Sequence, residues 1–198
     1  MNHPLRCRCG TLQGHLIPST SAIRAVCYCN DCQAYARFLS TPGVLDKNGG
    51  TEVVASLPKH VRFTGGLEAL ACLSLSDRGL LRWYAKCCNT PVANTPRNIN
   101  VPYVGLIRSC LGSRSAAIED SFGPLRIAVN TKTARNPVRS TPIASTAGVL
   151  GLTSSALVDR ISGMYKNNPF FERGTHKPIR PVRVLSKDER EQAYRRDA

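Results

Sequence analysis

Cysteines with the spacing of metal ligands are the residues of this chain that point most directly to chemistry. Cys7 and Cys9 stand in CRCG, and Cys27, Cys29 and Cys32 stand in CYCNDC. Side chains two residues apart in an extended segment point to the same face. A following turn, which the glycine of CRCG permits, brings both sulfur atoms to about 2.3 Å from one metal ion. Each motif therefore predicts a metal-binding loop.

A third cluster, KCCNTP, contains the adjacent residues Cys87 and Cys88. Successive side chains diverge, so both can share one ion only where the backbone kinks. Cys7 and Cys9 can be completed by one or both of these residues, which leaves the three cysteines of CYCNDC as a separate set. A closed structural zinc has four ligands, whereas a catalytic zinc has three and an open position.

Other readings of the cysteines stay open at this point. The two spaced motifs could form one closed four-cysteine site without catalysis, or Cys87 could close the second site. Metal-free redox thiols are a further alternative, since C-x-x-C pairs also occur in redox motifs. Cys72 and Cys110 lie in apolar segments, and we expect them to be ordinary buried thiols.

The elements that must position these cysteines are mostly strands. Alternating polar and apolar residues predict strands at 12–17, 23–29, 51–57, 60–65, 70–75 and 80–85. The last two are joined by SDRG and predict a hairpin. Pro58 indicates a break between strands, and a short helix is predicted at 33–40.

Beyond residue 100 the pattern becomes more helical. We expect a short helix at 115–123 and a longer one at 145–168, with one face formed by Leu150, Leu157, Ile161, Met164 and Tyr165. Ser186 and Glu189 make a capping-box pattern for a final helix. The sequence thus predicts a mainly β fold with α-helices (α+β), with small antiparallel sheets at residues 5–105 and a helical or irregular extension at 106–198 packed on them.

Charge and composition narrow the class of protein. The 198 residues have a formal net charge of +14, spread along the chain without a block of like charges, which favours a small anionic ligand or a polyanion as partner. No apolar run has the roughly 18 residues of a membrane span, so we expect no membrane partner. Nine cysteines cannot all pair, and the first residues contain no apolar leader. We therefore expect a reducing cytoplasm.

The order of the motifs resembles a known family. C-x-C-G, then C-x-C-x-x-C about twenty residues on, then a cysteine followed by x-T-P after an aromatic-rich strand is similar to the glutathione-dependent formaldehyde-activating enzymes, whose domain centromere protein V shares. The resemblance covers about residues 5–105. The third motif departs from the family's C-x-x-C-G-T/S-P, because Ala85 stands where the first cysteine belongs and Cys87 is shifted from it.

The resemblance implies a β-tent fold and two Zn²⁺ ions per chain. The structural zinc would be bound by Cys7, Cys9 and Cys88, with either Cys87 or another, non-cysteine ligand in the fourth position. The catalytic zinc would be bound by Cys27, Cys29 and Cys32 and would keep an open position. Members of the family are carbon–sulfur lyases that join glutathione and formaldehyde to give S-hydroxymethylglutathione.

Three functions are consistent with these observations. The first is a zinc-dependent carbon–sulfur lyase acting on the adduct of glutathione, or another thiol, with a small aldehyde. The alternative is a non-catalytic, zinc-stabilised module that binds nucleic acid or another anionic partner. Against it, aromatic residues are few and not interleaved with the basic ones. The third is a metal chaperone or a purely structural domain.

Residues around the second motif are weaker candidates. Arg24 or Arg37 could offset the charge of three thiolates and bind a carboxylate of the substrate. Asp31 is expected to form the turn between Cys29 and Cys32. Tyr28 and Tyr35 could line a pocket. The four histidines have no partner spacing and are expected to be incidental: His3, His15, His60 and His176.

Overall fold

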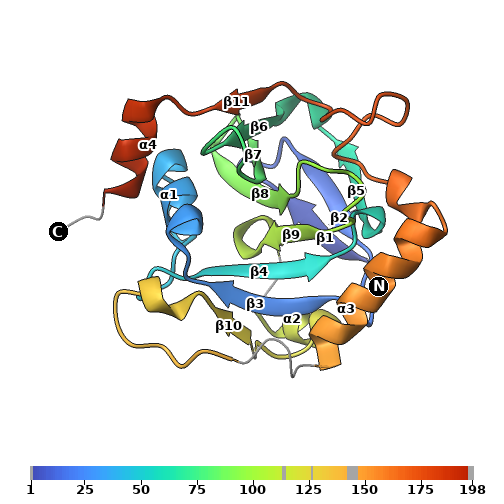
Figure 1. The fold of residues 1–198 in the computed structure, drawn as a ribbon, viewed down its shortest axis with the longest axis horizontal. Coiled ribbons are helices and arrows are strands. Elements are labelled where there is room, and N and C mark those ends of the chain that lie inside the picture. Colours follow the sequence, from blue (N-terminus) through green and yellow to red (C-terminus); the bar gives the residue numbers. More distant parts are fainter. Residues whose placement is uncertain (1, 113–114, 126, 142–146, 196–198) are drawn as a thin grey trace.

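Two β-sheets packed face to face organise the chain, which we describe from a computed structural model (Figure 1). The structure describes residues 2–112, 115–125, 127–141 and 147–195. The small sheet is antiparallel and consists of β1 (His3–Arg6), β2 (Gln13–Leu16) and β5 (Val61–Gly65), in that order. With its larger sheet and its helices, the chain has the predicted α+β class.

The large sheet is mixed. Its order is β10 (Ile127–Val129), β3 (Ile23–Cys27), β4 (Thr51–Ser56), β9 (Val104–Ile107), β8 (Thr90–Thr95), β7 (Leu81–Ala85), β6 (Leu70–Ser74) and β11 (Val182–Val184). In the spatial order β3, β4, β9, β8, β7 and β6, each strand is antiparallel to its neighbours. The two edge strands, β10 and β11, are parallel to their partners β3 and β6. Residues far along the chain therefore extend both edges of the sheet formed by the first half.

All six strands predicted from alternation are present, and β6 and β7 form the predicted hairpin. A 3₁₀ turn at Pro58–His60 separates β4 from β5, as Pro58 indicated. Strands β8 and β9 were not predicted, because both are buried along their whole length and so do not alternate. The edge strands β10 and β11 have three residues each, too few for a pattern.

The main core lies between the two sheets. Leu5 and Leu12 of the small-sheet region pack with Trp83 and Leu106 of the large sheet, all almost fully buried. On the opposite face of the large sheet lies α1 (Asn30–Leu39), whose Ala36 belongs to a second apolar cluster over β3, β4 and β9. This helix begins three residues earlier than predicted, inside the cysteine motif, because Cys29 caps its N-terminus.

The C-terminal helix α4 (Lys187–Tyr194) packs along α1 (Figure 1). The predicted capping box is present: the Glu189 amide donates to Ser186 Oγ at 3.2 Å, and the Ser186 amide donates to Glu189 Oε2 at 3.0 Å. The short helix predicted at 115–123 is also present, as α2 (Ser115–Phe122).

Helix α3 (Ala147–Ile161) differs from its prediction in length and in the face it buries. It ends seven residues before the predicted end, and Gly163 just beyond it has a left-handed φ of +77°. Residues 145–146 of the predicted helix lie outside the described residues. Leu152 packs on Ala55 and Leu57. Of the face predicted from the sequence, Tyr165 beyond the helix packs against the main core, whereas four residues are exposed: Leu150, Leu157, Ile161 and Met164.

Within the described residues, every helix is too short or too polar to cross a membrane.

Gly66, before β6, is a position where no other residue fits. Its φ is +65°, and an added Cβ would lie 2.0 Å from the Thr11 carbonyl oxygen. We expect Gly66→Ala to lower the free energy of unfolding by about 2–5 kcal/mol, from backbone strain and overpacking together. Urea denaturation measures this change. Gly174→Ala, where nothing lies within 4 Å of the added carbon, is the control and should change stability by less than about 0.5 kcal/mol. Equal stability of the two variants would contradict the described turn.

Candidate metal centres

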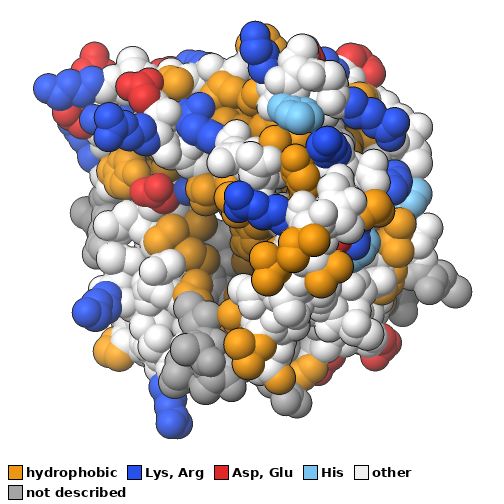
Figure 2. Space-filling view, turned by 45° about the vertical axis from the view of Figure 1, so that its right-hand side comes forward, with side chains coloured by type: hydrophobic (Ala, Val, Ile, Leu, Met, Phe, Trp, Pro, Cys, Tyr) orange, Lys and Arg blue, Asp and Glu red, His pale blue; other side chains and the backbone are white. Residues whose placement is uncertain are grey.

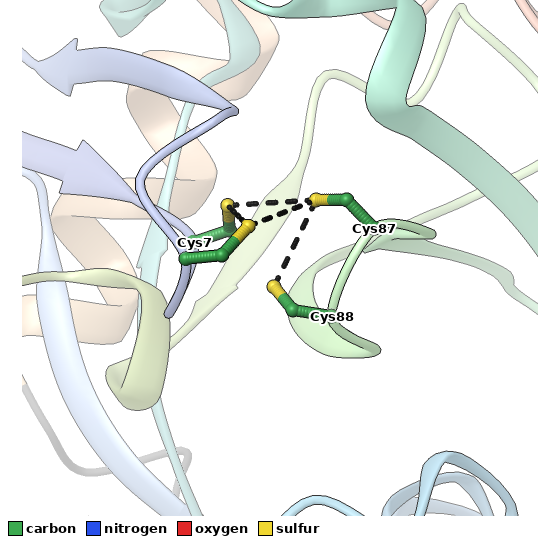
Figure 3. Close-up of side chains that lie close together, drawn as sticks. Cys7, Cys87 and Cys88 are labelled. Atoms are coloured by element: carbon green, nitrogen blue, oxygen red, sulfur yellow. Dashed lines mark hydrogen bonds between the residues drawn. The ribbon is translucent and has the colours of Figure 1, made fainter.

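Four cysteine sulfur atoms converge between the two sheets. Cys7 and Cys9 follow β1 of the small sheet, and Cys87 and Cys88 form the turn between β7 and β8 of the large sheet (Figure 3). The Sγ–Sγ distances are 3.5 Å between Cys7 and Cys9, 3.3 Å between Cys9 and Cys87, and 3.8 Å from Cys87 to both Cys7 and Cys88. We call these residues the four-cysteine group.

Two backbone features bring these sulfur atoms together. Gly10 has a φ of +83°, and its amide donates to the Cys7 carbonyl oxygen at 3.0 Å, which turns the first loop. Asn89 has a φ of +53°, a left-handed conformation that asparagine tolerates, and it supplies the kink that adjacent cysteines need. Both cysteines of the doublet therefore face Cys7 and Cys9.

The geometry of the four-cysteine group fits a tetrahedral ion. Ligands about 2.3 Å from a tetrahedral metal are about 3.8 Å from one another. Four of the six sulfur–sulfur separations, at 3.3–3.8 Å, lie at or just below this value, and all four sulfur atoms lie within 4.8 Å of one another. The Leu12 amide also donates to Cys7 Sγ at 3.3 Å, which stabilises negative charge on that sulfur. This group could hold a metal ion.

The second cluster contains three cysteines, which we call the three-cysteine group. Cys27 ends β3, Cys29 is the N-cap of α1, and Cys32 lies in the first turn of that helix. Their ligand atoms lie within 4.8 Å of one another, and the Cys32 amide donates to Cys29 Sγ at 3.4 Å. Among the described residues, no further cysteine, histidine or acidic side chain joins this group. It too could hold a metal ion, with one ligand fewer from the protein.

Two polar side chains from distant parts of the chain, Asn130 and Arg82, donate to the three-cysteine group. Asn130, after β10, donates from Nδ2 to Cys27 Sγ at 3.3 Å. Arg82 of β7 donates from Nη1 to Cys32 Sγ at 3.8 Å, and only 1% of this arginine is exposed. Burial and the negative charge of the thiols of Cys32 and Cys27 raise the pKa of Tyr103 to about 12. Tyr103 therefore keeps its proton at neutral pH and can donate a hydrogen bond.

The thiols of the three-cysteine group share their protons unequally. Hydrogen bonds from Cys29 and Cys32 lower the pKa of Cys27 to about 2, while hydrogen bonding to Cys27 raises the pKa of the other two thiols. Without metal, the group therefore carries one thiolate near neutral pH. Because metal ligands must be deprotonated, binding of an ion by all three cysteines would release two protons.

The arginines expected near this group are engaged elsewhere. Arg24 pairs with Glu52 at 2.8 Å on the other face of the large sheet and donates to the Gly123 carbonyl oxygen. Arg37 donates to Gln33 Oε1 and to the Ala193 carbonyl oxygen. Arg82 takes the expected place beside the sulfur atoms. The sequence signal that could have identified Arg82 is its position between Leu81 and Trp83 in an apolar strand. A charged residue in such a strand is seldom fully buried unless it is paired.

The other candidates have structural contacts. Tyr28 donates to Asp46 Oδ2 at 3.0 Å, and Tyr35 donates to the Trp83 carbonyl oxygen at 2.8 Å. Asp31 lies in the first turn of α1, as a turn former would. Cys72 and Cys110 are buried and lie outside both groups. Among the described residues, the histidines join no cluster of metal-ligating side chains: His3, His15, His60 and His176.

Comparison with known families places the chain. A family model of unknown function, DUF6151, matches residues 1–157. The chain belongs to the DUF6151 family. The match includes both cysteine groups and ends before α4. No curated protein matches the chain. A crystal structure of a Rhodobacter sphaeroides protein is similar with a TM-score of 0.43 and 17% sequence identity, covering 62% of this DUF6151 chain and 96% of the other.

The assignment of Cys87 to the four-cysteine group is testable. We expect Cys87→Ala to lower the metal content by one ion per chain and to lower the melting temperature, because a structural metal contributes folding free energy. Native mass spectrometry and thermal unfolding measure the two effects. Cys72→Ala removes a buried thiol outside both groups and should keep the full metal content. If Cys87→Ala keeps both its metal and its melting temperature, Cys87 is not a ligand.

Proposed function

We propose that this protein binds two zinc ions, one closed and structural and one with an open coordination position. We further propose that it acts as a carbon–sulfur lyase-like enzyme on the adduct of glutathione, or another thiol, with a small aldehyde. The observation that carries the proposal is the division of the cysteines into a complete set of four and a separate set of three. The resemblance of the motifs to the formaldehyde-activating enzymes supports the same division.

Sulfur ligands favour zinc in both places. Thiolates select zinc, copper(I) or iron–sulfur clusters, and a tetrahedral set of four is typical of structural zinc. None of the nine cysteines forms a disulfide, and all nine are among the described residues. A reducing compartment such as the cytoplasm would keep them as thiols and available to metal.

In this proposal Cys27, Cys29 and Cys32 hold the catalytic ion. A zinc ion with an open position would bind the substrate thiol as thiolate or polarise the aldehyde oxygen. The bond formed is between the thiol sulfur and the carbonyl carbon, and the thiol proton ends on the carbonyl oxygen. The lyase direction reverses these changes, so no oxidant or reductant is needed.

The surrounding side chains suit these charge changes. Asn130 and Arg82 donate to the sulfur atoms of Cys27 and Cys32 and so stabilise them as thiolates.

Glutathione binding tests this function. We expect zinc-loaded protein to bind glutathione in calorimetry, and Cys29→Ala to bind at least about tenfold more weakly, because it loses one ligand of the open ion. Circular dichroism checks that the variant is folded, since Cys29 also caps α1. Cys72→Ala serves as the control and should bind as the wild type does. Equal binding by the wild type and Cys29→Ala would refute the assignment.

The net charge of +14 favours the second candidate, a non-catalytic module that binds nucleic acid. On the face shown in Figure 2, however, lysine and arginine side chains are scattered rather than gathered into one stripe. We therefore expect fluorescence anisotropy to detect only weak binding to DNA or RNA, lost at physiological salt, as for contacts to phosphates alone. Tight binding at that salt concentration, without glutathione binding, would favour the module over the enzyme.

A further inference from the structure

A chain of polar contacts runs from the C-terminal helix to the three-cysteine group. Tyr194 of α4 donates from its hydroxyl to Asp31 Oδ1 of α1 at 2.5 Å. Asp31 Oδ2 lies 3.6 Å from Arg82 Nη2 on β7. Arg82 Nη1 lies 3.8 Å from Cys32 Sγ. Three elements that are far apart in the sequence thus meet at one cysteine ligand.

Arg82 is held on several sides. Its Nη1 also donates to Asn94 Oδ1 on β8 at 3.2 Å, and its guanidinium lies 5.3 Å from the centre of the Tyr35 ring. Its side chain is only 2% exposed. A buried charge of this kind is costly unless it is paired. Arg82 contacts the Asp31 carboxylate and the Cys32 sulfur, which would be a thiolate when it binds a metal ion. The position of the guanidinium is therefore set by these neighbours and not by solvent.

We propose that α4 is a positioning element of the three-cysteine group. Tyr194 fixes Asp31, and Asp31 together with Asn94 holds the guanidinium of Arg82 against the sulfur of Cys32. Arg82 then offsets the charge of the ligand set. The inference rests on the binding of a metal ion by this group, as proposed above, and not on the lyase reaction.

The charges explain why such a cation is needed. Three thiolates around Zn²⁺ carry a net charge of −1, since three negative charges exceed two positive ones. The guanidinium of Arg82 would bring the net charge of this partly buried assembly to zero. Interactions between charges are much stronger away from water, so an uncompensated charge there would weaken binding of the ion. Asp31 adds a negative charge, but its side chain is 50% exposed and therefore screened by solvent.

Helix α4 lies outside the residues that the family model matches. The DUF6151 match ends at residue 157, whereas α4 spans Lys187–Tyr194. The helix is joined to α1 by a second contact, since Arg37 Nη1 donates to the Ala193 carbonyl oxygen at 3.1 Å. Both contacts place the last turn of α4 beside the helix that carries Cys32.

Tyr194→Phe in the full chain is the decisive variant, because it removes the hydroxyl and keeps the ring. We expect the zinc affinity of the three-cysteine group to fall about tenfold, the lower end of what loss of an outer-shell partner costs. The four-cysteine group should keep its affinity and so serves as an internal control. Competition with a chelator measures both affinities. ¹¹³Cd NMR separates the two sites, and only the three-thiolate resonance should shift.

Three further variants test the inference. Lys187→Ala on the same helix removes only a surface pair with Glu191 and should change neither site. Arg82→Met should weaken the three-cysteine group more than Tyr194→Phe does, and Arg82→Lys should restore part of the loss by returning the charge. If Tyr194→Phe changes neither site, or weakens both equally, the inference is overturned. If the wild-type three-cysteine group binds no zinc at all, the proposed function fails with it.

Discussion

The convergence of four sulfur atoms between the two sheets is the constraint on which the rest of the structure depends. Two of them follow the first strand of the small sheet, and two form a turn of the large sheet. Four thiolates within 4.8 Å of one another would repel one another strongly, and a metal ion, which this group could hold, would offset their charge. Two hydrogen bonds between backbone and side-chain atoms link the same two loops. The Arg8 amide donates to Thr90 Oγ1 at 3.0 Å, and Arg8 Nη2 donates to the Cys88 carbonyl oxygen. The apolar core, the four-cysteine group and these hydrogen bonds together hold the two sheets face to face.

Completion of the four-cysteine group defines the second site. Because Cys87 and Cys88 both turn toward Cys7 and Cys9, neither contributes to the three cysteines beside α1. Those three lie where a strand ends and a helix begins, and a buried arginine from β7, another strand of the same sheet, donates to the sulfur of Cys32. The proposed function rests on this division, with the group of four assigned to stability and the group of three to chemistry.

The parts of the site that depend on local spacing could be predicted, and the parts that depend on distant partners could not. C-x-C-G and C-x-C-x-x-C place their sulfur atoms together through the geometry of a few residues. The doublet was ambiguous because its outcome depends on the left-handed conformation of Asn89. Arg82 was missed because Cys32 is 50 residues away from it. The face of α3 was misjudged for a similar reason: buried Asp159 pairs with Lys59 across 100 residues.

The central claim is that one chain holds a closed metal site and an open one. Crystallography of the zinc-loaded protein, with diffraction data on both sides of the zinc absorption edge, tests it most directly. The account predicts two anomalous peaks, one bound by Cys7, Cys9, Cys87 and Cys88, and one bound by Cys27, Cys29 and Cys32 with a non-protein fourth ligand. A single peak, or a second peak whose fourth ligand is a protein side chain, would contradict it.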